Sequence, residues 1–137
     1  VAEHFEVSIE SYWSTAQVES VLPFVDQLVV MTYDTGFHDP RLFSWWVEQQ
    51  TLALSKRVGP DVELFIGVPC YSVGSRFDPE AENITSSLKG YERGIENIRS
   101  TAGNITGLAI YPYWEMDEDE WTQLRTHFQT HETDSAQ

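Results

Sequence analysis

The sequence predicts an α/β fold with parallel strands, and three observations support this. Short apolar segments alternate along the chain with segments that have the helical period. Some of the apolar segments are continuous, which is typical of parallel strands that are buried on both faces. The strand–helix order occurs four times, and strands joined by helices form right-handed βαβ units. Two architectures fit this order: an open four-stranded α/β sheet, or half of a (β/α)8 barrel.

The first two units run from Phe5 to the Gly59–Pro60 pair. Residues Phe5 to Tyr12 alternate apolar and polar side chains, as in a strand. Ser14 is a suitable N-cap for the helix that follows, with Gln17 as its capping-box partner, and Pro23 ends that helix. Residues Gln27 to Tyr33 form a continuous apolar strand that we expect to be buried on both faces.

Local signals also delimit the remaining elements. Asp39 and Pro40 begin the second helix as its cap and first turn, and Gly59–Pro60 ends it. Two further strands are predicted at Glu63–Pro69 and Ile105–Tyr111. Between them, apolar residues recur at helical spacing from Ile84 to Ile98.

The last helix has the clearest start signal. Asp117 is its N-cap and Glu120 completes a capping box. After Phe128 the chain is polar, so we expect one domain over residues 1–128 and a polar tail over residues 129–137.

Composition limits the classes of partner. The formal net charge is −14 and only Lys56 and Lys89 are lysines, so nucleic acid is not an expected partner. No apolar run is long enough to cross a membrane. The four histidines show no metal-ligand spacing, and the single Cys70 is expected to be a small buried residue. We therefore expect no metal and no cofactor.

The unusual polar and aromatic groups lie where the predicted strands end. In a barrel of parallel strands the functional residues occupy these carboxyl ends. The residues concerned are Glu10, Tyr12, Tyr33, Asp34, Cys70, Tyr71, Tyr111, Tyr113, Trp114 and Glu115.

Three strand sequences resemble those of the glycoside hydrolase family 18 barrels, the chitinase-like proteins. VDQLVVMTYDTG resembles the sixth strand of that family, which ends in Met-x-Tyr-Asp or a close variant. ELFIGVPCYS is similar to the seventh strand and GLAIYPYWEM to the eighth. The resemblance extends from Phe5 to about Phe128. It implies that the chain is the (βα)4 C-terminal half of a TIM (β/α)8 barrel, comprising strands five to eight.

The resemblance also implies a chemistry. Active members of the family use the N-acetyl group of the substrate as the nucleophile and retain the anomeric configuration, on β-linked N-acetylglucosamine glycans. Tyr33 and Asp34 match the residues that position this N-acetyl group, and Met31 would line the base of the pocket. Either Tyr111 or Trp114 would supply the aromatic floor. The other expected substrate-binding residues are Glu10, Tyr12, Tyr71 and Glu115.

The general acid of the family is a glutamate at the end of the fourth strand, which we expect to lie outside this chain. Residues Glu3 to Glu10 show acids at three positions of that motif, but the middle aspartates are replaced, so Glu10 is interpreted as a rim residue. The isolated chain should then turn over substrate poorly. Two alternatives are a non-catalytic carbohydrate-binding barrel and an unrelated α/β domain in which Tyr33 and Asp34 simply end a strand.

The expected partners follow from the half-barrel interpretation. They are a glycan, and either a second copy of the chain or the missing N-terminal half, because a half barrel has two unpaired strand edges. The family resemblance also suggests secretion.

Overall fold

The structure is a computed structural model that describes residues 14–72, 78–98 and 104–135. The predicted strand over Phe5 to Tyr12 lies outside these residues, and with it the candidates Glu10 and Tyr12.

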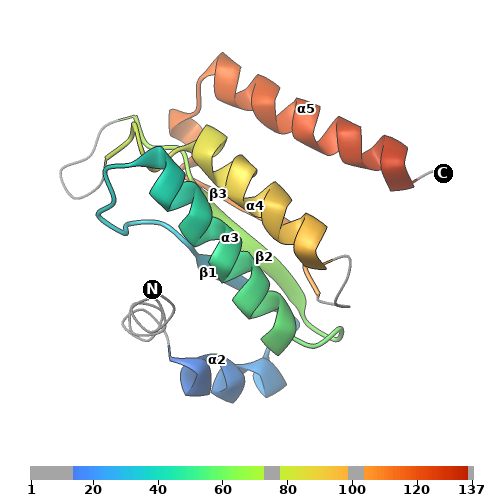
Figure 1. Cartoon of the computed structure of the whole chain (residues 1–137). Coiled ribbons are helices and arrows are strands. Elements are labelled where there is room, and N and C mark those ends of the chain that lie inside the picture. The colour runs from blue at the N-terminus through green and yellow to red at the C-terminus, as the bar shows by residue number, and fades with distance from the viewer. Residues whose placement is uncertain (1–13, 73–77, 99–103, 136–137) are drawn as a thin grey trace.

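The described chain is an α/β structure with a three-stranded parallel sheet in the order β1-β2-β3 (Figure 1). The elements are α2 (Thr15–Val21), η1 (Leu22–Phe24), β1 (Gln27–Met31), α3 (Pro40–Arg57), β2 (Glu63–Pro69), α4 (Ile84–Ile98), β3 (Gly107–Tyr111), η2 (Tyr113–Glu115) and α5 (Glu118–Ser135). The α3 and α4 helices cover the same face of the sheet, and α5 lies alongside α4 (Figure 1). No helix in the described part of the chain combines the length and apolarity needed to span a membrane.

Side-chain caps begin the helices where the sequence predicts them. Ser14 and Gln17 form a reciprocal capping box at α2. The Asp39 carboxylate accepts a hydrogen bond from the backbone N–H of Arg41 at the start of α3. At the start of α5, the N–H of Asp117 donates to the Glu120 carboxylate at 3.0 Å, and the N–H of Glu120 donates to the Asp117 carboxylate at 2.8 Å. These hydrogen bonds confirm the predicted caps. Each cap forms because the first helical turn leaves backbone N–H groups without partners, and the capping side chain accepts from them.

Two glycines allow α3 and α4 to pack closely. A Cβ atom added at Gly90 would lie 2.1 Å from the carbonyl oxygen of Ser44, and one added at Gly94 would lie 2.7 Å from the Thr51 side chain. Any larger side chain at Gly90 would therefore force the two helices apart. This contact fixes the second βαβ unit against the first.

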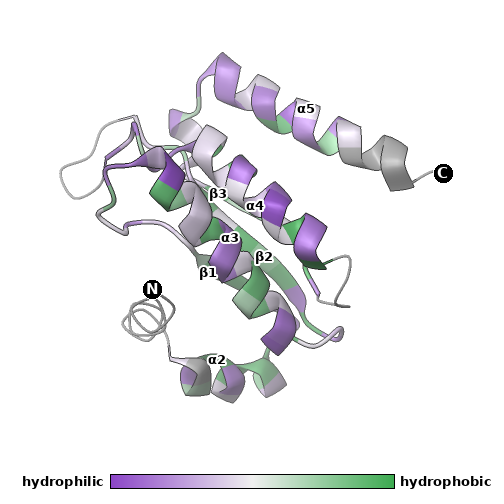
Figure 2. Ribbon diagram, in the orientation of Figure 1, coloured by the Kyte–Doolittle hydropathy of each residue, from purple (hydrophilic) through white to green (hydrophobic). Residues whose placement is uncertain are grey.

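The hydrophobic core lies between the sheet and the helices. On β2, Leu64, Ile66 and Val68 have no exposed area, and they contact a cluster that includes Phe43 and Val47 of α3. Hydrophobic colouring accordingly runs along β2, the central strand (Figure 2). The β2 strand has the bounds that the sequence predicts.

The other face of the sheet carries no layer among the described residues. Val29 and Met31 of β1 are 46% and 66% exposed, and they lie in register with Phe65 and Gly67 of β2. The prediction that this strand is buried on both faces is therefore wrong. Only Leu28 and Val30, which alternate with the exposed residues, pack against the core.

Three boundaries differ from the predictions. The β3 strand begins at Gly107, two residues after the predicted Ile105. The β1 strand ends at Met31, so Tyr33 and Asp34 follow the strand instead of ending it. The α5 helix continues through the polar residues after Phe128 to Ser135. Polar composition does not end a helix when no glycine or proline interrupts it.

Candidate functional site

Tyr33, two residues after β1, is the first candidate side chain and points into the interior. Thr32 extends the pairing with β2, because its N–H and its hydroxyl both donate to the Gly67 carbonyl, at 3.1 and 3.0 Å. Tyr33 follows and is only 7% exposed. The strand end thus holds the Tyr33 ring in a fixed position beside the ends of the other two strands.

Aromatic rings from all three strand ends meet at this position. Tyr33 and Tyr111 are stacked, with centroids 6.1 Å apart and 7° between the ring planes. Tyr71 meets Tyr33 edge to face at 5.7 Å, and Trp114 meets Tyr111 edge to face at 5.6 Å. From the sequence, either Tyr111 or Trp114 was expected to form the aromatic floor of the sugar site. The structure brings both residues into the cluster.

The cluster is open to solvent on the β3 side. Tyr111, Tyr113 and Trp114 are 49%, 60% and 65% exposed. Tyr113 also meets Trp114 edge to face, at 5.5 Å. A row of partly exposed aromatic rings is a surface that a ligand with an apolar face can cover. We call Tyr33, Tyr71, Tyr111, Tyr113 and Trp114 the aromatic platform.

Asp34 lies next to the platform in an unusual backbone conformation. Its φ angle is +64°, in the left-handed region that non-glycine residues seldom adopt and that aspartate tolerates better than most. Gly36, two residues later, has a φ angle of +74°. Asp34 is exposed. The loop therefore presents a carboxylate at the surface through a strained turn.

Glu82, in the segment just before α4, holds this turn in place. Its side chain has no exposed area. One carboxylate oxygen, Oε2, accepts the N–H of Asp34 at 2.7 Å. The other, Oε1, accepts the N–H groups of Thr35 and Gly36 at 2.9 and 3.1 Å and the Thr35 hydroxyl at 2.6 Å. Three successive backbone donors converge on one anion, the arrangement called a nest.

Sequence reasoning missed Glu82. It lies in a stretch that reads as a polar loop, where a glutamate is normally solvated. Ala81, directly before it, and Ile84, two residues after it, are fully buried. These two apolar residues are the local signal that the glutamate is buried.

Two other contacts tie the strand ends together. Glu115 Oε2 accepts both the N–H and the hydroxyl of Ser72, each at 3.0 Å. The Cys70 thiol donates to the Pro112 carbonyl at 2.9 Å, and burial raises the pKa of this thiol to about 12. Cys70 is thus a structural residue, as expected, while Glu115 is engaged with the loop after β2.

Burial also makes the phenols of the platform harder to deprotonate. It raises the pKa of Tyr33 to about 12, with smaller contributions from Tyr111, Cys70 and Asp34. Burial likewise raises the pKa of Tyr71, with Tyr33, Asp34 and Glu82 adding to the effect. Both phenols therefore keep their protons at neutral pH, so both can donate a hydrogen bond.

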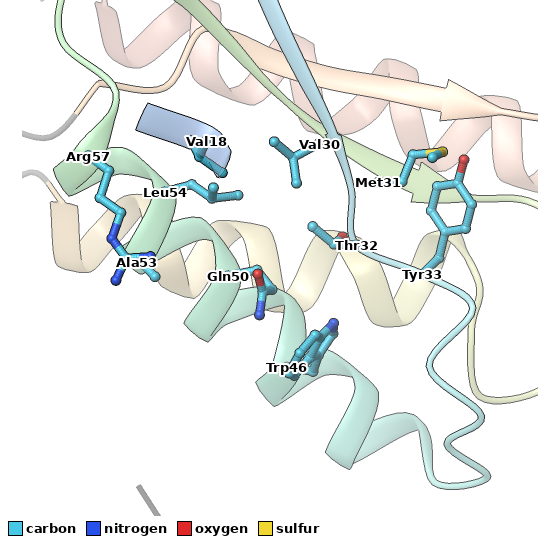
Figure 3. Close-up of a pocket in the computed structure, with 10 residues that line it drawn as sticks. All are labelled: Val18, Val30, Met31, Thr32, Tyr33, Trp46, Gln50, Ala53, Leu54 and Arg57. Carbon is cyan, nitrogen blue, oxygen red and sulfur yellow. The ribbon is translucent and has the colours of Figure 1, made fainter. Parts of the chain in front are cut away.

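Met31 lies on the uncovered face of the sheet, directly before this site. It also borders a small cavity on the helix side of β1, shown in Figure 3, with Trp46 and Gln50 of α3 on the opposite wall. The cavity volume of about 40 Å³ is far below the several hundred that a small-molecule site needs. This cavity is therefore too small to hold a small-molecule ligand.

Within the described ranges, no group of three or more His, Cys, Asp or Glu residues could hold a metal ion.

No protein-family model, no curated protein and no solved structure matches this chain.

Proposed function

We propose that the chain is a (βα)4 half of a chitinase-like TIM barrel that binds β-linked N-acetylglucosamine glycans at the carboxyl ends of its strands. The observation that carries the proposal is a cluster of rings at the carboxyl ends of the strands, formed by Tyr33, Tyr71, Tyr111 and Trp114. Asp34 lies next to this cluster, close to Tyr33 and Tyr71. In barrels of parallel strands this edge is the functional one.

The arrangement of layers supports the half barrel. The strands follow one another in sequence order and both crossover helices lie on one face, whereas a doubly wound sheet has helices on both faces. The uncovered face carries small or apolar residues, including Val29, Gly67 and Ala109. In a closed barrel, such a face is the interior.

The chemistry of the site suits an N-acetyl sugar. A protonated Tyr33 phenol can donate to an amide oxygen, while the Asp34 carboxylate can accept from an amide N–H. The two groups would thus hold both ends of one amide dipole and fix its orientation, which can contribute several kcal/mol to an intramolecular attack. The exposed rings of Tyr111 and Trp114 would stack on the apolar face of the sugar.

The same geometry favours binding over turnover by this chain alone. Of the carboxylates near the platform, Glu82 is fully buried and Glu115 accepts two hydrogen bonds from Ser72. We place the general acid of the substrate-assisted reaction outside this chain. A hydrolysis assay on chitin oligosaccharides tests this, with Glu10→Gln as the comparison: turnover that depends on Glu10 would contradict it.

Calorimetry tests the binding. The chain should bind a β-1,4-linked N-acetylglucosamine trimer more tightly than the glucose trimer of the same linkage, because only the former carries the amide. Asp34→Asn, which tolerates the left-handed conformation, should weaken binding of the N-acetyl trimer about tenfold or more, since hydrogen bonds to charged groups contribute about 1.5–3 kcal/mol. Equal affinity for both trimers, unchanged in Asp34→Asn, would favour an unrelated α/β domain.

A further inference from the structure

The turn that carries Asp34 is anchored to the segment before α4 by Glu82. Its three successive N–H groups and the Thr35 hydroxyl all donate to Glu82. A second link between this loop and the segment before α4 is the 3.1 Å contact of His38 with Asp78, in which the His38 side chain is 81% exposed. Exposed ion pairs contribute little, so the buried carboxylate determines the path of the turn.

Glu82 is itself rigidly placed. The N–H of Glu82 donates to the Asp78 carbonyl at 2.7 Å, within a turn that runs directly into α4. The Asn83 side chain caps that helix by accepting the N–H of Ser86 at 3.0 Å, and it also donates to the Pro79 carbonyl. The α4 helix is in turn fixed against α3 at Gly90. A continuous set of contacts therefore leads from the helix packing to the Asp34 turn.

A carboxylate is the group that this position requires. All four hydrogen bonds run toward Glu82, and they use both of its oxygens. A glutamine of the same shape would offer one accepting oxygen and would aim its NH₂ group at a backbone N–H. The donor left without an acceptor would then be buried, which is costly.

We propose that Glu82 is the positioning residue of the strand-end site: its buried carboxylate holds the turn from Asp34 to Gly36 in the left-handed conformation that presents Asp34 to the ligand. This role rests on the proposed glycan binding. Glu82 does not touch the ligand, and it acts on binding only through the Asp34 turn.

The test combines two readouts on the full chain. Amide resonances and hydrogen exchange report on the three donors, and calorimetry with the N-acetylglucosamine trimer reports on binding. In Glu82→Gln, the amides of Asp34, Thr35 and Gly36 should shift and lose protection, and binding should weaken about tenfold or more. The amides of β2 should stay protected.

A matched control separates positioning from stability. Val58→Ala opens a hole in the core at the C-terminal end of α3, away from the turn and from the Gly90 contact, and should lower thermal stability while affinity stays within about twofold of the unaltered chain. Thr35→Val keeps Glu82 and removes one of its hydrogen bonds, so binding should weaken by a smaller factor of roughly three to ten. This second variant provides the test even if Glu82→Gln does not fold.

The outcomes are distinguishable. Normal affinity in Glu82→Gln or in Thr35→Val, or unchanged amides of the turn in Glu82→Gln, would overturn the role of Glu82. Equal losses of affinity in Val58→Ala and Glu82→Gln would also overturn it, because they would show a general effect of destabilisation. Failure of the unaltered chain to bind the trimer would overturn the proposed function itself, and this role with it.

Discussion

The rings of Tyr33 and Tyr111 lie parallel, 6.1 Å apart, although they follow or end strands that are not neighbours in the sheet. The central strand β2 separates them and contributes Tyr71, which meets both rings edge to face. Three strands thus converge on one cluster of phenols. The ring contacts thus bring together three tyrosines that the sequence analysis places at three different strand ends.

The charge state of these phenols gives a prediction for alkaline pH. Burial raises the pKa of Tyr33 and of Tyr91 to about 12, against about 10 for an exposed tyrosine. Between these values the unfolded chain releases protons that the folded chain keeps, so unfolding becomes easier as pH rises. The free energy of unfolding should therefore be maintained below pH 10 and fall as the pH rises toward 12.

Denaturant unfolding at a series of pH values from about 9 to 12 measures this. Tyr33→Phe should make the alkaline decline less steep, because it removes one of the groups concerned. If the free energy of unfolding fell with pH equally steeply in the variant, folding would not raise the pKa of Tyr33.

The contact of α3 with α4 predicts a severe effect at one glycine. In Gly90→Ala the new methyl group would lie 2.1 Å from the Ser44 carbonyl oxygen and 2.9 Å from the Val47 Cβ atom. Both neighbours are buried residues of α3, so the chain should lose about 3 kcal/mol of stability or fail to fold. Gly59→Ala is the matched control, because nothing lies within 4 Å of its Cβ position. Comparable thermal stability of the two variants would contradict the close packing.

The uncovered face of the sheet predicts self-association. Val29 and Met31 are exposed there, and an uncovered apolar sheet face normally marks an interface. We expect sedimentation velocity to show dimers or larger species. Met31→Glu should shift the distribution toward monomer, because it places a charge on that face. A monomeric chain of high thermal stability would count against the half barrel.

The sequence predicts the elements whose signals are local. Asp39 with Pro40 and Asp117 with Glu120 mark helix starts that the structure confirms, because a cap depends only on residues within one turn. The bounds of β2 follow from its continuous apolar run, since this central strand is covered by neighbours on both edges.

Residues that depend on the tertiary arrangement were not predictable in the same way. Val29 and Met31 are as apolar as the residues of β2, and only the absence of a second layer over the described sheet leaves them exposed. The role of Glu82 arises because a turn far away in the sequence brings three N–H groups to it. No pattern in the polar loop itself requires that meeting.

The measurement that tests the central claim most directly is a resonance-by-resonance titration of the full chain with the N-acetylglucosamine trimer. We expect the changes in NMR chemical shift to concentrate at residues 31–36, 69–72 and 111–115, which form the strand-end site. Asp34→Asn should reduce them throughout that set. A groove between α4 and α5, lined by Leu88 and Glu92 on one side and by Gln123 and His127 on the other, is the alternative place for a ligand. Chemical-shift changes confined to that groove, or no changes at ligand concentrations in the millimolar range (about −4 kcal/mol of binding free energy), would contradict the proposed site.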